Sequence, residues 1–145
     1  MKKLLIVALI VVAAGTSAFA ADVRVDNKVK NSFAALFAGA ENITWTASQH
    51  YLKAAFLLNE ESVEAFFSKE GELIGTSRKV DLKKLPLSAI QRIKKDYASY
   101  KVTESIEFER AEGDRSFYVS IENGNKKQIL EVSVYGTVTT YRNDK

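Results

Sequence analysis

The 145-residue chain has no cysteine, a single proline and a single histidine. Without cysteine it can form no disulfide bond, thiolate zinc site, cysteine nucleophile or lipidated N-terminal cysteine. His50, the only possible base for a Ser-His-Asp triad, lies in a predicted turn with no nucleophile motif nearby. The glycines are scattered over predicted turns and form no phosphate-binding loop. We expect no cofactor, no metal site and no enzymatic activity; paired carboxylates such as Glu64 and Glu107 are the enzymatic alternative.

Long apolar runs are also absent, except at the start of the chain. Lys2 and Lys3 precede an apolar block at 4–14, and small residues follow as far as Ala18-Phe19-Ala20. This pattern is typical of a secretory signal peptide at 1–20 that is cleaved after Ala20. The block is too short to span a bilayer of about 30 Å. We therefore expect a periplasmic or secreted protein without stable membrane insertion, and the lack of disulfides favours a bacterial one.

Neither sign of charge dominates once the signal is removed. Cleavage takes away Lys2 and Lys3, so that Lys plus Arg falls from 21 to 19 against 18 acidic residues, a net charge of +1. Such a protein has no bulk electrostatic reason to bind nucleic acid or anionic lipid. The basic residues between 78 and 101 are best explained as a solvated helix face, although an acidic partner or a second copy could bind there. A homodimer is left open.

The same order of elements occurs twice in the mature chain. Helical spacing of apolar residues at 26–38, and the only proline at the start of 86–98, predict two helices. Four strand patterns follow each helix, near 42–46, 51–58, 63–67 and 73–80, and near 101–110, 117–121, 129–135 and 137–142. A shift of 65 residues aligns Ser68 with Ser133 and Gly71 with Gly136. We predict an α+β fold of two tandem α-β-β-β-β repeats, 21–80 and 81–145, packed as one body with the helices on one face of an antiparallel sheet. One eight-stranded domain without a repeat is the alternative.

Five aromatic residues are predicted to lie on the strand face opposite the helices: Tyr51, Phe66, Tyr118, Tyr135 and Tyr141. If the helices cover one face only, these rings form an exposed apolar patch, and such patches often mark protein interfaces. Two alternatives are that the rings pair across strands only to stabilise the sheet, or that the faces are assigned the wrong way round.

Several short pieces of the chain, taken in order and spacing, carry a family resemblance. They are Asn42-Ile43-Thr44-Trp45, Tyr51-x-x-Ala54-x-Phe56, Val63-Glu64-Ala65-Phe66-Phe67, Gly71-Glu72-x-Ile74-Gly75, and Leu85-Pro86 ahead of a helix ending in Tyr97. In these pieces, which cover most of the mature chain, the protein resembles the PepSY-like family, also described as β-lactamase-inhibitor-like exported bacterial proteins. The resemblance implies tandem copies of a helical layer against an antiparallel sheet, and a non-catalytic role in binding or inhibiting another protein.

The resemblance also indicates where contacts would form. Inhibitors of this shape insert hairpin loops into an active site, and here the loops are 59–61 and 112–115, with Asn59, Glu60, Glu112 and Asp114 as candidate contact residues. We therefore expect a module that binds an envelope or extracellular protein, with an inhibitor of a peptidase or other envelope enzyme as the specific form. A periplasmic small-ligand carrier or sensor, with a closed apolar pocket between helices and sheet, is the alternative.

Overall fold

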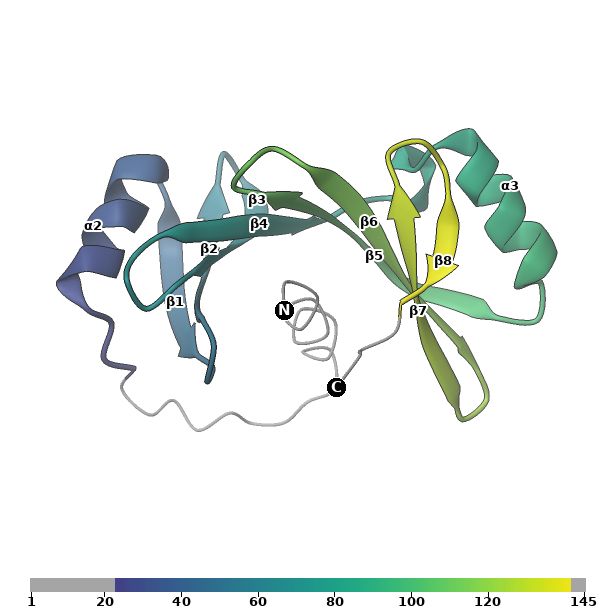
Figure 1. Ribbon diagram of the computed structural model, residues 1–145, viewed down its shortest axis with the longest axis horizontal. Coiled ribbons are helices and arrows are strands. Elements are labelled where there is room, and N and C mark those ends of the chain that lie inside the picture. Colours follow the sequence, from purple (N-terminus) through teal and green to yellow (C-terminus); the bar gives the residue numbers. More distant parts are fainter. Residues whose placement is uncertain (1–22, 142–145) are drawn as a thin grey trace. The chain divides into compact units, whose positions relative to one another are not determined.

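The computed structural model describes residues 23–141, so the expected signal peptide at 1–20 lies outside the described residues. The elements follow in the order α2 (Asn27–Leu36), β1 (Glu41–Ala47), β2 (Leu52–Leu58), β3 (Glu61–Phe67), β4 (Leu73–Lys79), η2 (Leu82–Lys84), α3 (Leu87–Asp96), β5 (Lys101–Arg110), β6 (Arg115–Asn123), β7 (Lys126–Ser133) and β8 (Val138–Thr140). All eight strands belong to one antiparallel sheet, in which each strand neighbours the next along the chain (Figure 1). The predicted α+β class and antiparallel meander are therefore confirmed.

The described chain divides into two compact units. The first unit contains residues 23–80 and 106–116, and the second contains residues 81–105 and 117–141. Each unit has one α-helix. The tip of the β5–β6 hairpin is grouped with the first unit, whereas the sequence pattern places the whole hairpin in the second repeat.

In the first unit, α2 begins and ends close to where the sequence predicts. Asp26 is extended, with φ −61° and ψ 147°, and its Oδ1 accepts a hydrogen bond from the Lys28 backbone N–H at 2.8 Å. An extended Asp whose side chain accepts from the first helical turn is a typical N-cap. The helix buries Val29 and Phe33, but Leu36, which helical spacing from Val29 (i+7) predicts on the same buried stripe, is 54 % exposed. Leu36 is the last helical residue, and the ring of Phe37 packs on the core in its place.

The core of the first unit is an aromatic cluster between α2 and the strands. Neighbouring rings of this cluster have centroids 5.0–6.4 Å apart and mostly meet edge to face; they are Phe33, Phe37, Trp45, Phe56 and Phe67. Leu52, Ala54 and Ala65 complete the buried surface beneath the helix. Each fully buried Phe is worth roughly 1.5–3 kcal/mol of transfer free energy. Ile43 and Trp45 alternate with polar residues, a pattern that predicts a strand with both side chains on a covered face. Ile43 is nevertheless 43 % exposed, because β1 is the edge strand of the sheet.

In the second unit, α3 begins directly after Pro86, as the proline predicts. Ala89 and Ile93 are its buried residues. Ile90 and Tyr97, which helical spacing (i, i+3, i+7) predicts on the same inner stripe as Ile93, are half-buried. The helix contacts β8 (Figure 1). The Tyr97 hydroxyl lies 3.5 Å from the Thr140 hydroxyl. The strands of this unit contribute Val119, Ile121, Leu130, Val132 and Val138 to its buried residues.

The strand register of the first unit assigns each side chain to a face. Leu52, Ala54 and Phe56 of β2 pack toward α2. Because side chains alternate along a strand, Tyr51 and Lys53 lie on the opposite face, which we call the distal face. Directly paired residues of neighbouring strands share a face. The distal face therefore continues through Phe66 of β3, which pairs with Lys53, and through Ser77 of β4, which pairs with Glu64. It reaches β5 at Phe108, which pairs with Ser77.

Candidate functional site

The aromatic residues of the distal face pack against one another. The rings of Tyr51 and Phe66 meet edge to face at 5.4 Å and 69°, and those of Phe66 and Phe108 meet at 6.1 Å and 61°. In the second unit, Tyr118 and Tyr141 meet at 5.7 Å and 90°. Such pairs add about 0.5–1.5 kcal/mol beyond the area they bury.

The prediction that five aromatic residues are exposed on this face is wrong for four of them. Tyr51 is 7 % exposed, Phe66 and Tyr118 are each 1 % exposed, and Tyr141 is 9 % exposed. Each of these rings packs edge to face on an aromatic neighbour, which is the cross-strand pairing that the sequence left as an alternative. Tyr135 alone is open to solvent, at 90 %, because it lies in the turn between β7 and β8 and not on a strand.

Gly75 makes the packing of Phe108 possible, and sequence reasoning missed this residue. A methyl group at Gly75 would lie 2.7 Å from the Phe108 ring and 2.6 Å from the Glu109 carbonyl oxygen. The ring therefore covers the glycine backbone, as is common where two strands approach closely. A glycine inside a predicted strand is the signal that could have revealed it.

A polar network lies beside the rings of the distal face. Lys53 Nζ is 2.8 Å from Glu64 Oε1, and the Ser77 hydroxyl donates to Glu64 Oε2 at 3.2 Å. Lys53 is only 7 % exposed, so its ammonium group is largely removed from water and paired with Glu64. Burial raises the pKa of Tyr51, the Ser48 hydroxyl lowers that pKa, and the charge of Glu64 raises it further. The sequence singled out neither Lys53 nor Ser77.

Glu107 belongs to a second ionic network on the face opposite the distal one. Its Oε2 accepts from Arg78 Nε at 2.8 Å and lies 2.7 Å from Arg78 Nη2, while its Oε1 lies 3.5 Å from Arg115 Nη1. The hydrogen bond and the charge of Glu107 raise the pKa of Arg78. Because Glu64 shares a face with Phe108, the residue next to Glu107, the two carboxylates point to opposite faces of the sheet. They cannot act together as an acid-base pair.

The turn between β2 and β3 exposes two of the predicted contact residues. Asn59 and Glu60 are both exposed and both left-handed, with φ 51° and 68°. The hairpin beneath them is regular, with unbroken pairing from Leu52 opposite Phe67 to Leu58 opposite Glu61. A left-handed conformation costs a non-glycine residue about 1–2 kcal/mol, although Asn tolerates it better than Glu.

The other predicted loop lies elsewhere in the same unit. Glu112 and Asp114 are exposed in the β5–β6 turn, which Arg110 N–H closes by donating to the Asp114 carbonyl at 2.8 Å. This turn follows Arg110, whose partner on β4 is Gly75, whereas the Asn59 turn lies at the Arg78 end of β4. The two loops are therefore at opposite ends of the first unit and do not form one surface.

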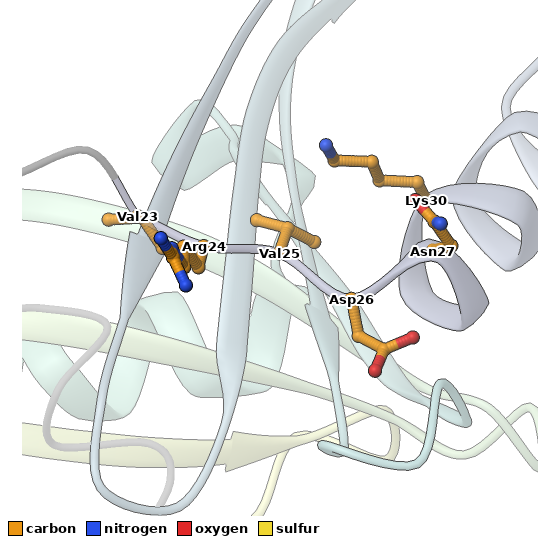
Figure 2. Close-up of a pocket in the computed structure, with 6 residues that line it drawn as sticks. All are labelled: Val23, Arg24, Val25, Asp26, Asn27 and Lys30. Atoms are coloured by element: carbon orange, nitrogen blue, oxygen red, sulfur yellow. The ribbon is translucent and has the colours of Figure 1, made fainter.

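Two hollows flank α2. A cleft of about 410 Å³ between α2 and the edge strand β1 is lined mainly by apolar residues: Phe33, Ala34, Phe37, Ala38, Gly39, Ala40, Ile43 and Trp45, with Lys30. A hollow of about 580 Å³ lies at the start of the helix, beside 23–27 and Lys30 (Figure 2). In Figure 2 the side chains of Asp26 and Lys30 point in different directions, so this second hollow gathers no common set of ligand groups.

Within 23–141, no group of three or more His, Asp or Glu side chains is arranged to hold a metal ion. None of the helices described there is long and apolar enough to cross a membrane.

The fold is similar to those of several solved structures of bacterial proteins. The structure is similar, with a TM-score of 0.73 and 14 % identity, to a candidate periplasmic protein from Bacteroides eggerthii, over 81 % of this chain and 90 % of that one. A DUF2874 family protein from Bacteroides ovatus matches with a TM-score of 0.73 and 19 % identity, over 83 % and 89 % of the two chains. A BLIP-like, that is β-lactamase-inhibitor-like, protein from Bacteroides fragilis matches with a TM-score of 0.68 and 18 % identity, over 85 % and 91 %.

No family model and no curated protein matches the sequence. The structural matches therefore support the β-lactamase-inhibitor-like fold implied by the sequence resemblance, but not its specific assignment to the PepSY-like family.

Proposed function

We propose that this chain is an exported, non-catalytic module that binds another protein, and that the β2–β3 turn with Asn59 and Glu60 is its principal contact. The site is a polar hairpin tip on a rigid sheet, so it fits a partner with a polar, concave surface. Inhibition of a peptidase or other envelope enzyme is the specific form that we propose.

The observation that supports this proposal is the conformation of Glu60. Two-residue hairpin turns favour glycine where φ is positive, and the β6–β7 turn uses Gly124 at φ 56°. The β2–β3 turn instead keeps a charged, β-carbon-bearing residue, Glu60, at φ 68° and at an exposed position. Backbone strain at a residue with positive φ is usually retained where its side chain has a function. The function proposed for Glu60 is to present a carboxylate at the tip of the hairpin.

The other residues predicted to bind a partner have secondary functions in this proposal. Tyr51 and Phe66, with Phe108, stiffen the sheet below the turn, and Lys53 with Glu64 fixes the side chains between them. Tyr118 and Tyr141 do the same in the second unit. Glu112 and Asp114, at the other end of the first unit, form a separate acidic contact that a large partner would reach.

We also propose that the two halves of the chain, 21–80 and 81–145, are tandem repeats. The β3–β4 and β7–β8 turns share their hydrogen bonds: the N–H of Gly71 donates to the Ser68 carbonyl, and the N–H of Gly136 donates to the Ser133 carbonyl. Both glycines are left-handed, with φ 92° and 87°, and each lies against the α-helix of its own unit. Such agreement favours one duplicated unit over two hairpins that are alike by chance.

The test of the binding proposal is a pull-down from the envelope fraction of the producing organism with residues 21–145 as bait. Glu60→Gly removes the carboxylate and relaxes the backbone, so this variant should fold at least as well as the parent but lose the retained protein. Glu70→Ala, an exposed acid in the β3–β4 turn, is the matched control and should retain it. Equal retention by all three baits would exclude the β2–β3 turn as the contact.

The carrier alternative has less support in the first unit. It requires an enclosed apolar pocket between helix and sheet, and the rings of Phe33, Phe56 and Phe67 occupy that space. The cleft beside α2 opens at the surface instead. Native mass spectrometry of the protein purified from its own envelope would support a carrier if one small molecule remained bound.

A further inference from the structure

An exposed apolar knob lies at the β7–β8 turn of the second unit. Leu87 is 69 % exposed, Val134 44 % and Tyr135 90 %. The turn and the start of α3 are in contact, because a methyl group at Gly136 would clash with the Ser88 hydroxyl and lie 3.3 Å from Pro86 Cβ. Leu87, between Pro86 and Ser88, is therefore next to the turn. We call Leu87, Val134 and Tyr135 the apolar knob.

The corresponding turn of the first unit shows that the fold does not require this knob. There, the Ser68 hydroxyl accepts from the N–H groups of Glu70 and Glu72, both at 3.2 Å. In the second unit, the Ser133 hydroxyl accepts from the N–H groups of Tyr135 and Thr137, at 3.3 and 3.1 Å. Lys69 and Glu70 thus occupy the positions that Val134 and Tyr135 occupy in the β7–β8 turn. The same backbone accommodates two charged residues, so the exposed valine and tyrosine are not needed to form it.

Two more large apolar residues of the described chain are exposed, and one of them lies at a hollow surface. Leu36 is 54 % exposed on α2, and Ile43 is 43 % exposed on β1 and lines the 410 Å³ cleft between these two elements. The rings of Phe37 and Trp45 also line this cleft, and Lys30 adds an ammonium group. The chain therefore carries both a protruding apolar surface and a recessed one.

We propose that the apolar knob of one copy docks into the α2–β1 cleft of a second copy. Tyr135 enters the cleft between Phe37 and Trp45, with its hydroxyl accepting from Lys30, while Val134 and Leu87 cover Ile43 at the rim. Buried aromatic anchors of this kind dominate weak protein contacts, and tyrosine carries both an apolar ring and a polar end. This contact is independent of the proposed partner site at Asn59 and Glu60.

The symmetry of the contact follows from its two different surfaces. Knob and cleft are separate patches, so the interface is heterologous, and each copy can donate one knob and accept another. Association then gives a closed ring or an open chain, and in either case the average mass of the particles rises with concentration. The patches are small, so the contact is weak, as expected for interfaces that bury less than about 1,200 Å².

Sedimentation velocity of residues 21–145 over a roughly hundredfold range of concentration tests the proposal. The parent protein should sediment progressively faster as concentration rises. Val134→Lys/Tyr135→Glu, which copies Lys69-Glu70, should remain monomeric with an unchanged melting temperature. Ala34→Glu, which places a carboxylate in the cleft at an exposed helical position, should also remain monomeric. An equimolar mixture of the two variants should form a dimer and no longer species, since one functional knob and one functional cleft remain.

Three results would overturn the proposal. One is a parent protein that stays monomeric at every concentration. Another is association that survives both variants. The third is a variant mixture that stays monomeric although each variant is folded. Parallel flotation with phosphatidylglycerol–phosphatidylethanolamine vesicles distinguishes a lipid surface: knob-dependent flotation by a protein that is always monomeric would assign the knob to the membrane instead.

Discussion

Ser68 and Ser133 make the same hydrogen bonds in the two halves of the chain. The backbone N–H of Ser68 donates to the Glu72 carbonyl at 2.8 Å, and that of Ser133 donates to the Thr137 carbonyl at 3.0 Å. Each hydroxyl also accepts from the N–H groups two and four residues later. A serine therefore supplies, in each unit, the acceptor that an exposed turn would otherwise leave to water.

Ser68→Ala and Ser133→Ala should destabilise the protein by similar amounts. Each substitution removes one acceptor of two backbone hydrogen bonds, so we expect a loss of about 1 kcal/mol in the free energy of unfolding in each case. Urea unfolding followed by circular dichroism measures both. Ser62→Ala, at an exposed strand position, is the control. A cost at one turn only would contradict the equivalence on which the proposed repeat depends.

Gly75→Ala should be strongly destabilising. The added methyl group would lie 2.6 Å from the Glu109 carbonyl oxygen and 2.7 Å from the Phe108 ring, so strand β5 or the ring must shift. Overpacking of this kind costs about 1–3 kcal/mol. Thermal unfolding of Gly75→Ala and of Gly75→Ala/Phe108→Leu tests this cause. The smaller leucine side chain should restore part of the lost stability. If it restores none, the contact with the Glu109 backbone alone is responsible.

Stability should fall in alkaline solution partly because of Tyr51. Burial and Glu64 raise its pKa in the folded state above the value of 10.0 for an unperturbed phenol. The folded state thus binds the phenolic proton more tightly than the unfolded state does. The resulting stabilisation is complete below about pH 10 and is lost as the pH rises from there through the folded pKa.

The measurement for Tyr51 is urea unfolding at several pH values from 8 upward, beside ultraviolet titration of the phenols. Tyr51→Phe should show a shallower fall in stability above about pH 10 and lack one late-titrating phenol. The same slope in both proteins would mean that Tyr51 ionises as freely in the folded state as in the unfolded state.

Glu107→Gln should cost more than Glu61→Gln. Glu107 is 8 % exposed and is contacted by Arg78 and Arg115, so neutralising it weakens charge-assisted bonds and should cost about 1–3 kcal/mol. The Glu61 side chain is 69 % exposed and 3.6 Å from Arg78, so its loss should cost less than about 1 kcal/mol. Chemical denaturation compares the two; equal costs would mean that the Glu107 network is no stronger than a surface ion pair.

The sequence predicts the fold well because its signals are local. Asp26 and Pro86 indicate the starts of the helices, and the alternation of apolar residues in β2 and β3 gives the correct faces. The direction of Tyr51 and Phe66, away from α2, follows from that two-residue period. The edge position of β1 depends instead on how strands pair over long distances, and for this reason the exposure of Ile43 was missed.

The candidate site was harder to predict because the burial of a side chain depends on which residues pack against it in the folded protein. Phe66 and Tyr118 were correctly placed on strands, but the sequence does not show which rings pack on them. In the sequence, Lys53 is indistinguishable from a surface lysine. Only the pairing of β2 with β3 shows that Glu64 lies beside it. Glu60 is different again: the residues 59–61 indicate a turn, but only the structure shows a charged residue held at positive φ.

The most direct test of the proposed function uses the absence of cysteine. Glu60→Cys introduces the only thiol of the chain, and a thiol-reactive photo-crosslinker attached there samples whatever contacts the β2–β3 turn; Glu70→Cys, labelled in the same way, is the control. We expect that, in the envelope fraction, the probe at position 60 forms one dominant adduct with another protein, whereas the probe at position 70 forms little of it. The same adducts at both positions, or none at position 60 beside one at position 70, would contradict it.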